Sequence, residues 1–477
     1  MRRRNLIMTA AMVIVLLSIG TTAFTAYHHM GEDDSGIFLS IYPDKAGTKL
    51  DSCSLCHSGS PDKKMGSCQW CHDTYGYDAS GNIDDTLNPY GMAYKTNGRN
   101  ANAVTAIDAL DSDGDGYSNK VEIAAIRYPG DPNDDPTRVP APYQVYSREE
   151  LEQMPQHTQF LLMNASKSTD NYAEYTGVTL ENLIQGSMLN SATGIKVFSP
   201  DGFSGTHPFD PDPKLYHVFG IYPEASFYYD AIADISLNPD GWCDYSAPSV
   251  EGRNDGDPII NPDGLKMILA IKRDGQSLDP GVLNDQNKLD GEGPFRAVPP
   301  QKVPGPPDQR STGSNPSLPW PYDKNADHNA GSSTRSVTII KVEPLPEGTT
   351  DIDTLEAGWK YIDEEKIVVY GAIDPVPTIL EKLDNLALIL LETDDTAFKN
   401  RLSNDALINK LEAVKKQVTH GAYAEALEKL QNDILKKTDG CVVGSVVDRN
   451  DWVTDCEKQK QFYWSINEIM VLLNILV

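Results

Sequence analysis

The chain has 477 residues, of which 39% are hydrophobic and 8% are aromatic. This apolar content is enough to build folded cores, so it excludes a wholly disordered protein, and the length suits about three domains. The formal net charge is −28. Such acidity argues against nucleic acids and anionic lipid surfaces as partners, and it favours cations and basic proteins.

Residues 1–26 have the pattern of a secretory signal peptide. Three arginines, Arg2 to Arg4, precede an apolar run that ends near Leu17, and small residues follow up to Ala23 and Ala26. We expect cleavage after one of these alanines; without cleavage, the segment would stay as a single membrane anchor. Export would place the protein in the periplasm, at the cell surface or outside the cell, where disulfides can form.

Two C-x-x-C-H pentapeptides lie within residues 27–101, which we expect to form a small domain whose core is haem rather than aliphatic side chains. The motif residues are Cys53, Cys56, His57, Cys68, Cys71 and His72. In each motif the two thiols can form thioethers with the vinyl groups of a haem, and the histidine can bind the iron. A four-ligand zinc knuckle is the alternative, but zinc does not require a histidine directly after each pair. The sequence therefore predicts two c-type haems.

The two haems are expected to lie close together, because the chain between the motifs spans at most about 35 Å. Each iron needs a second axial ligand or an open position. The candidate distal ligands in this region are His28, His29, Met65 and Met92. The two histidines also fit a mobile new N-terminus. Three histidines expected in loops further along the chain are additional candidates, although hydrogen bonding is the default role of a loop histidine: His207, His217 and His328.

Residues 102–142 contain a calcium-loop pattern followed by a Pro-rich linker. The loop matches D-x-[DN]-x-[DN]-G-x5-E at every specified position. The expected ligands are Asp111, Asp113, Asp115, Tyr117 through its carbonyl, Asn119 and Glu122. A short helix over 102–110 should precede the loop, and the prolines at 129 and 132 should end the helix that follows it. We expect one structural calcium site, with an ion-free acidic turn as the alternative.

The first third of the chain resembles multihaem c-type cytochromes that carry an EF-hand-like calcium loop. The two C-x-x-C-H motifs and the loop from Asp111 to Glu122 carry this resemblance. Similar multidomain haem proteins occur in metal-respiring bacteria. The resemblance implies electron transfer to redox partner proteins or to an extracellular electron acceptor.

Residues 143–374 change to short β-type runs separated by loops rich in Pro, Gly and Asp. The runs are 160–163, 195–198, 265–271, 336–342 and 367–370. Residues 175–183 (YTGVTLENL) resemble a segment of the sulfite-oxidase-like molybdopterin family. Stretches similar to later segments of that family follow in order at 199–203, 267–278, 293–298 and 336–343. The resemblance implies a β-rich fold and, in active members, a molybdenum-pterin cofactor.

The expected molybdenum cysteine is missing from this central region. In the family that cysteine precedes the segment at 175–183, but residues 161–166 contain none. Cys243 comes well after it, and its role stays open. This departure makes a molybdopterin cofactor doubtful and favours a scaffold or docking surface over sulfite-oxidase chemistry.

Residues 375–477 are rich in helix formers and predict a small helical bundle. Three apolar faces recur at helical spacing: Ile379, Leu383, Leu386 and Leu390; Leu407, Leu411, Val414 and Val418; and Tyr423, Leu427, Leu430 and Ile434. His420 and Gly421 indicate a helix end. A last helix should begin near Gln461 and run to the end of the chain. A disulfide between Cys441 and Cys456 is expected to close the loop before it.

The sequence as a whole predicts a multidomain α+β protein with a haem-cored N-terminal domain, a β-rich central domain and a C-terminal bundle. The leading hypothesis is an exported dihaem c-type cytochrome that transfers electrons. The alternative is a molybdopterin-dependent oxidoreductase that passes electrons from a small substrate to its own haems. An adhesion or assembly role is less favoured, because covalent haem attachment needs dedicated machinery. No nucleophile and base pair for hydrolysis stands out.

Overall fold

The computed structural model describes residues 34–51, 53–57, 83–165, 170–199, 204–209, 218–222, 227–228, 231–232, 243–245, 248–254, 258–283, 289–301, 328–353 and 360–477. Within these ranges the chain contains both helices and sheets, as an α+β protein does. The expected signal peptide and the second C-x-x-C-H motif lie outside them. Across the same ranges, no helix has both the length and the hydropathy that a membrane span requires.

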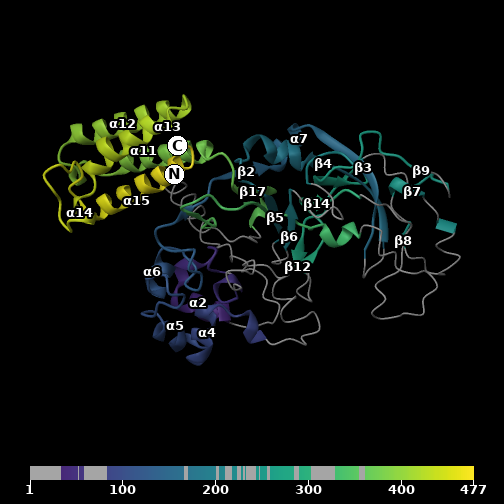
Figure 1. Cartoon of the computed structure of the whole chain (residues 1–477), viewed down its shortest axis with the longest axis horizontal. Coiled ribbons are helices and arrows are strands. Elements are labelled where there is room, and N and C mark those ends of the chain that lie inside the picture. The colour runs from purple at the N-terminus through teal and green to yellow at the C-terminus, as the bar shows by residue number, and fades with distance from the viewer. Residues whose placement is uncertain are drawn as a thin grey trace, which may run out of the picture.

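The first part of the described chain folds into short helices (Figure 1). They are α2 (Asp34–Ile41), η1 (Pro43–Lys45), η2 (Cys53–Leu55), η3 (Ile83–Thr86), α4 (Pro89–Thr96), α5 (Ala101–Ala106) and α6 (Asn119–Ala124). The helix expected over 102–110 ends early at Ala106. Leu110, which was expected on its apolar face, is 46% exposed.

These helices enclose a side-chain core. Phe38, Leu55, Tyr90, Ile107 and Ile123 are each at most 4% exposed and belong to one apolar cluster. The described part of this region therefore buries apolar side chains of its own, and the haem-cored domain stays a prediction. Leu55 belongs both to this cluster and to the first motif, so the apolar core lies directly beside the motif.

The central strands form two larger sheets that pack face to face. Among the described residues, one sheet has five strands in the order β2 (Tyr143–Ser147), β17 (Lys366–Gly371), β15 (Ile339–Glu343), β5 (Gly194–Phe198) and β6 (Ser204–Pro208). The other has six: β11 (Gln276–Ser277), β10 (Ile268–Arg273), β4 (Asp170–Thr179) and β3 (Gln156–Met163) in order, with β14 (Arg296–Val298) beside β10 and β8 (Cys243–Asp244) beside β4. All five predicted β-type runs overlap these strands.

An apolar core fills the space between the two sheets. Val178 of β4 and Leu269 of β10 meet Val197 of β5 and Ile340 of β15 in one buried cluster. Two helices add to this core, α7 (Arg148–Gln153) and α8 (Leu180–Ile184). Along β17, Val369 faces this cluster while its neighbour Val368 faces a second one, so both faces of the five-stranded sheet are covered.

The remaining central elements are short and lie around these sheets. They are η4 (Gln185–Ser187), β7 (Phe227–Tyr228), η5 (Pro248–Val250), β9 (Pro258–Ile259), β12 (Val282–Leu283), β13 (Leu289–Asp290), η6 (Asn329–Ser332), β16 (Thr349–Thr350) and α10 (Lys360–Asp363). The segment expected to be a linker is part of the fold. Its strand β1 (Val139–Pro140) pairs in parallel with β16.

A buried cluster of Lys49, Asp134 and Thr350 joins the N-terminal helices to the central strands. Lys49 Nζ lies 2.7 Å from Asp134 Oδ2, and the two side chains are 0% and 3% exposed. Thr350 of β16 donates to the other carboxylate oxygen of Asp134 and lies 3.3 Å from the Lys49 ammonium. Arg127 forms a second link, at 2.9 Å from Asp353. These bonds hold the region of the first C-x-x-C-H motif against the central strands.

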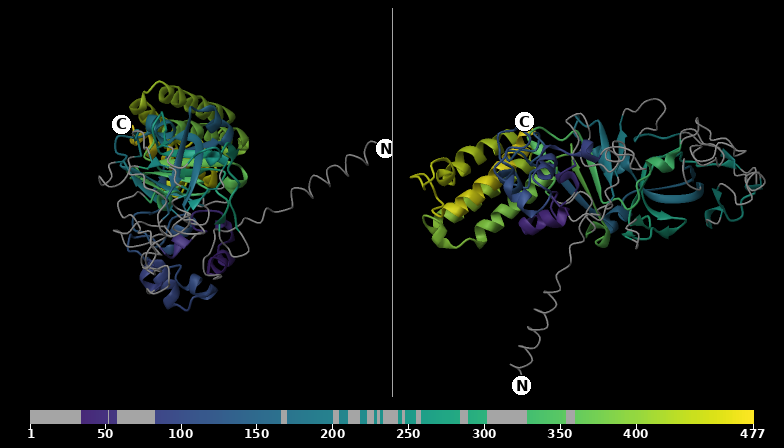
Figure 2. Two further views of the ribbon diagram at one scale, coloured as in Figure 1. Left: turned by 90° about the vertical axis from the view of Figure 1, so that its right-hand side faces the viewer. Right: turned by 90° about the horizontal axis from the view of Figure 1, so that it is seen from below.

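The C-terminal helices pack on one another at one end of an elongated molecule (Figure 2). They are α11 (Val376–Glu392), η7 (Asp395–Ala397), α12 (Arg401–Thr419), α13 (Tyr423–Lys429), a π-helical turn η8 (Leu430–Ile434), η9 (Leu435–Lys437), α14 (Gly440–Val443) and α15 (Cys456–Asn474). The faces predicted on α11 and α12 are buried. The last helix begins five residues before the predicted start, where Asp455 caps it.

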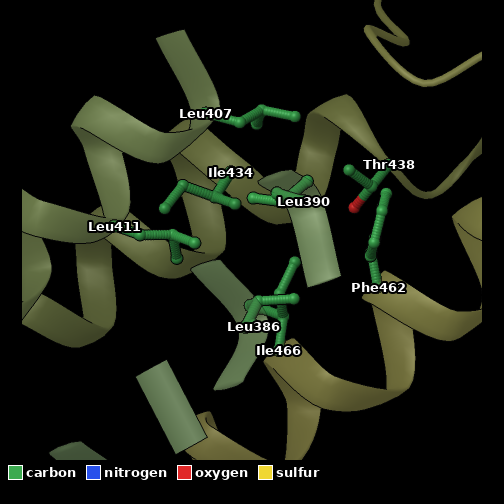
Figure 3. Close-up of a pocket in the computed structure, with 8 residues that line it drawn as sticks. All are labelled: Leu386, Leu390, Leu407, Leu411, Ile434, Thr438, Phe462 and Ile466. Carbon is green, nitrogen blue, oxygen red and sulfur yellow. The ribbon is translucent and has the colours of Figure 1, made fainter. Parts of the chain in front are cut away.

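The predicted disulfide between Cys441 and Cys456 is present, with 5.4 Å between the two Cα atoms. Inside the bundle a cavity of about 10 Å³ is lined by Leu390, Ile434, Phe462 and five other residues (Figure 3). Its lining is almost wholly aliphatic or aromatic, so we interpret it as a dry packing gap rather than a ligand site. The end of α12 is capped as expected, since His420 Nδ1 lies 2.6 Å from the carbonyl of Lys416.

Candidate haem and calcium sites

The first C-x-x-C-H motif is held by the start of helix α4. Cys53 and Leu55 bound the 3-10 turn η2, and Asn88 lies against it. The Asn88 backbone N–H donates to the Cys56 carbonyl at 2.9 Å, and its side-chain Nδ2 donates to the Leu55 carbonyl at 2.9 Å. Its Oδ1 accepts from the N–H of Gly91 and so caps α4. One buried amide therefore fixes both the motif and the helix.

Gly91 allows this close approach. A Cβ at this position would collide with the carbonyl of Cys56. Gly130 allows a second close approach, because a Cβ at that position would lie 2.5 Å from the Asn88 side chain. The two glycines let three backbone segments meet around Asn88.

The imidazole of His57 is oriented by Thr86, which lies two residues before Asn88. Its Nδ1 lies 2.7 Å from the hydroxyl oxygen of Thr86, the last residue of η3. Burial lowers the pKa of His57, which favours the neutral ring. A neutral ring whose Nδ1 is hydrogen-bonded presents Nε2 to a metal, and that is the arrangement found in metal-ligating histidines.

The donor set at this motif fits a covalently attached haem. The sequence places Cys53, Cys56 and His57 within five residues, and two thiols followed by an imidazole are the set that c-type attachment uses. Bound haem would supply one-electron chemistry at this position. Of the candidate distal ligands, His28, His29 and Met65 lie outside the described residues, as does the second motif Cys68, Cys71 and His72. Met92 lies on α4 with 43% of its surface exposed.

Of the three histidines expected in loops, one is placed differently from the expectation. His207 was expected in a loop but lies in strand β6 and is 2% exposed, and burial lowers its pKa to about 4. His328 precedes the 3-10 turn η6, and His217 lies outside the described residues.

The acidic loop is folded tightly around its own backbone. The carboxylate of Asp111 accepts from the N–H groups of Gly114 at 2.8 Å and Gly116 at 3.0 Å. Both glycines have positive φ, at +84° and +102°. Gly116 stands at the sixth position, where a calcium loop needs glycine for its sharp turn. One carboxylate oxygen each from Asp111, Asp113 and Asp115 lie within 4.8 Å of one another. The three side chains are therefore gathered around one point.

Glu122 gives the clearest sign of a cation. Its side chain is 0% exposed, and neither carboxylate oxygen has a hydrogen-bond partner in the part of the chain that the structure describes. One oxygen each of Asp113 and Asp115 is buried in the same unpaired state. Burial, followed by repulsion from Asp113 and Asp115, raises the pKa of Glu122 to about 9. Unpaired buried carboxylates are costly unless a cation binds them.

These residues fit calcium. Four carboxylate oxygens there have no hydrogen-bond partner among the described residues: one of Asp113, one of Asp115 and both of Glu122. Such oxygens are the hard ligands that calcium prefers. Asn119 differs from a free ligand, because its side-chain amide is hydrogen-bonded to the Ile107 carbonyl, just before the loop, and to Ser112 at the start of the loop. Its predicted coordination, like that of the Tyr117 carbonyl, stays a prediction.

Three of the stretches that resemble sulfite-oxidase-like domains meet in the six-stranded sheet. Tyr175 of β4, Arg273 of β10 and Arg296 of β14 gather around Glu292. Arg296 donates to Glu292 at 2.7 Å and to the Tyr175 hydroxyl at 3.1 Å. These ion pairs hold the pKa of Glu292 below its usual range, against the opposing effect of burial.

The position of the family's molybdenum cysteine offers no thiolate. That stretch lies at the end of β3 and includes Asn164, which is 0% exposed with neither side-chain amide atom hydrogen-bonded within the described ranges. Cys243 lies on β8, opposite Asp170 of β4, and is buried. The residues at the expected position therefore do not fit a cysteine-ligated molybdenum.

Sequence reasoning missed two residues that position the haem motif, Thr86 and Asn88. Asn88 could have been found, because an asparagine followed by Pro89 is a typical helix start. Thr86 has no such local signal. No protein-family model, curated protein or solved structure matches the chain.

Proposed function

We propose that this protein is an exported dihaem c-type cytochrome that transfers electrons in the periplasm or at the cell surface. The observation that carries the proposal is the environment of His57. Its ring is half-buried, favoured in the neutral form, and hydrogen-bonded through Nδ1 to Thr86, so Nε2 is the nitrogen available to an iron. The redox partners are proteins or an extracellular acceptor, and the strong acidity of the chain favours basic partners.

In this proposal the chain's own residues do three things. Cys53 and Cys56 anchor the haem covalently, and His57 ligates its iron. Asn88 and Gly91 hold the backbone of the motif against α4. The second motif repeats the same donor set close by along the chain, which suits electron exchange between the two haems.

The calcium loop has a structural role in the proposal. Ile107 and Ile123 flank the loop and belong to the same apolar cluster as Leu55 of the first motif. Calcium bound by Glu122 and its neighbours would hold the two ends of the loop together and so stabilise the core beside the haem. Extracellular calcium is plentiful, so we expect constitutive occupancy rather than signalling.

The finer organisation is also part of the proposal. We assign residues 27–101 to the dihaem unit, 102–142 to the calcium loop and its connection, 143–374 to a β-rich scaffold and 375–477 to a helical bundle. The buried contacts of Lys49 with Asp134 of the connection and with Thr350 of the scaffold support a fixed attachment of the haem unit.

A redox difference spectrum on variants of the exported protein tests the proposal. Substituting Cys56→Ser removes one thioether, and His57→Ala removes one iron ligand, so each should lose or alter about half of the c-type absorbance. The control is Cys243→Ser, which changes a cysteine outside both motifs and should leave the spectrum unchanged. A wild-type protein without a c-type spectrum would overturn the proposal.

A second candidate is an oxidoreductase that uses the central region. The observation in its favour is the meeting of Tyr175, Arg273 and Arg296 around Glu292, since three family-like stretches contribute to it. The lack of a cysteine at residues 161–166 stands against it. About one molybdenum per purified chain would favour this candidate, and its absence would leave the central region as a scaffold.

A further inference from the structure

Thr86 is placed to act on the haem through His57. It is 0% exposed, and its hydroxyl oxygen lies 2.7 Å from His57 Nδ1. Two residues further on, Asn88 bonds the carbonyls of Leu55 and Cys56. One short buried segment therefore holds both the histidine ring and the backbone from which that ring projects.

The chemistry of the ring decides the direction of this hydrogen bond. A neutral imidazole that binds iron through Nε2 carries its proton on Nδ1. That N–H then donates to the Thr86 hydroxyl oxygen. Such a bond fixes the plane of the ring and makes the imidazole a more basic ligand. A more basic ligand stabilises ferric over ferrous iron and so lowers the reduction potential.

We propose that Thr86 is a positioning residue that sets the reduction potential of the haem at the first motif. The inference rests on the proposed function, because it requires haem at Cys53 and Cys56. It adds a residue that belongs to neither motif and lies 29 positions from His57. In the opposite arrangement, with the hydroxyl donating to Nδ1, the proton would sit on Nε2 and the bond would not favour iron binding.

Spectroelectrochemical titration of the holoprotein tests this role. Thr86→Val keeps the shape of the side chain but removes the hydroxyl, so the potential of one of the two haems should shift to a more positive value. Thr86→Ser keeps the hydroxyl and should restore the wild-type potential. Thr105→Val is the matched control, because the Thr105 hydroxyl bonds only a helix carbonyl on the exposed side of α5 among the contacts described there.

Three results would overturn the inference: no shift in Thr86→Val, an equal shift in Thr86→Ser, or a shift in Thr105→Val. Haem content and melting temperature are measured on the same samples, so that a merely structural effect is seen as a loss of haem or stability. If Thr86→Val does not fold, Thr86→Ala carries the same expectation. A wild-type chain without covalent haem would overturn the proposed function itself, whereas an unmoved potential in a haem-loaded variant overturns only the role of Thr86.

Discussion

Glu122 is the single residue that most strongly links the acidic loop to a cation. Its two buried, unpaired oxygens favour calcium in the loaded protein and are unfavourable without it. Glu122→Gln should therefore weaken calcium binding at least tenfold, about 1.4 kcal/mol, yet raise the melting temperature of the calcium-free protein. Titration calorimetry and thermal melts in calcium and in chelator measure both effects. Glu149→Gln, at an exposed position of α7, should change neither; a destabilised calcium-free Glu122→Gln protein would contradict this role.

The same carboxyl groups predict how pH acts on the loop. Burial and mutual repulsion raise the pKa of Glu122 to about 9 and of Asp113 to about 6. Between the ordinary carboxyl range and pH 9, the calcium-free folded state thus binds more protons than the unfolded state. Its stability should fall as pH rises through this window. Calcium should bind more tightly at pH 8 than at pH 6, with release of protons. Chelator should lower the melting temperature more at the higher pH, and an effect that is equal at both would contradict the assignment.

At the scale of elements, helix α4 packs closely against the first C-x-x-C-H motif. Gly91→Ala should force α4 away from Cys56, because the new methyl group would collide with a backbone carbonyl. We expect a loss of stability of about 1–3 kcal/mol and reduced haem attachment at that motif. Gly36→Ala in α2 is the matched control: its Cβ meets no atom within 4 Å, so it should stabilise by about 0.5–1 kcal/mol. Urea unfolding and haem content distinguish the two.

The C-terminal helices depend on a covalent link. Cys441 and Cys456 are 15 positions apart, and closing a loop of this size stabilises by about 3 kcal/mol. The double variant Cys441→Ser with Cys456→Ser should lower the free energy of unfolding of the bundle by about this amount, and its unfolding midpoint should fall accordingly. Reductant should lower the wild-type midpoint to the same value and leave the variant unchanged. Equal midpoints of variant and wild type in oxidising buffer would count against the link.

At the scale of the whole molecule, the buried pair of Lys49 and Asp134, together with Thr350 of β16, joins the region of the first C-x-x-C-H motif to the central strands. Asp134→Asn would remove the carboxylate that lies 2.7 Å from the buried Lys49 ammonium. Breaking a buried pair in this way costs about 3–5 kcal/mol. Replacing both residues by apolar ones, as in Lys49→Met with Asp134→Leu, should recover much of that loss. Asp384→Asn, which breaks the exposed pair of Lys415 and Asp384, should leave the midpoint of chemical denaturation unchanged. If Asp134→Asn also leaves the midpoint unchanged, the buried pair does not hold the two parts together.

Patterns that are local in the chain were predictable. The helix faces with Leu383 and Leu407, the acidic loop and the cysteine pair at 441 and 456 all follow from periodicity or spacing. Contacts between distant residues were not. Thr86 contacts His57, which is 29 positions away in the sequence, and Lys49 contacts Thr350, which is 301 positions away. No periodicity in the sequence predicts either contact. The placement of His207 was wrong because its neighbours Ser204 to Pro208 are polar or small, yet β6 pairs with β5 and buries it.

The haem assignment is decided by counting covalently bound haem on the exported chain. Mass measurement of the intact, denatured polypeptide should find it heavier by two haem groups, because thioethers survive denaturation. The same sample should show a c-type spectrum that changes on reduction. A denatured chain whose mass is that of the mature polypeptide without haem would contradict the assignment, and one added haem would limit it to a single motif.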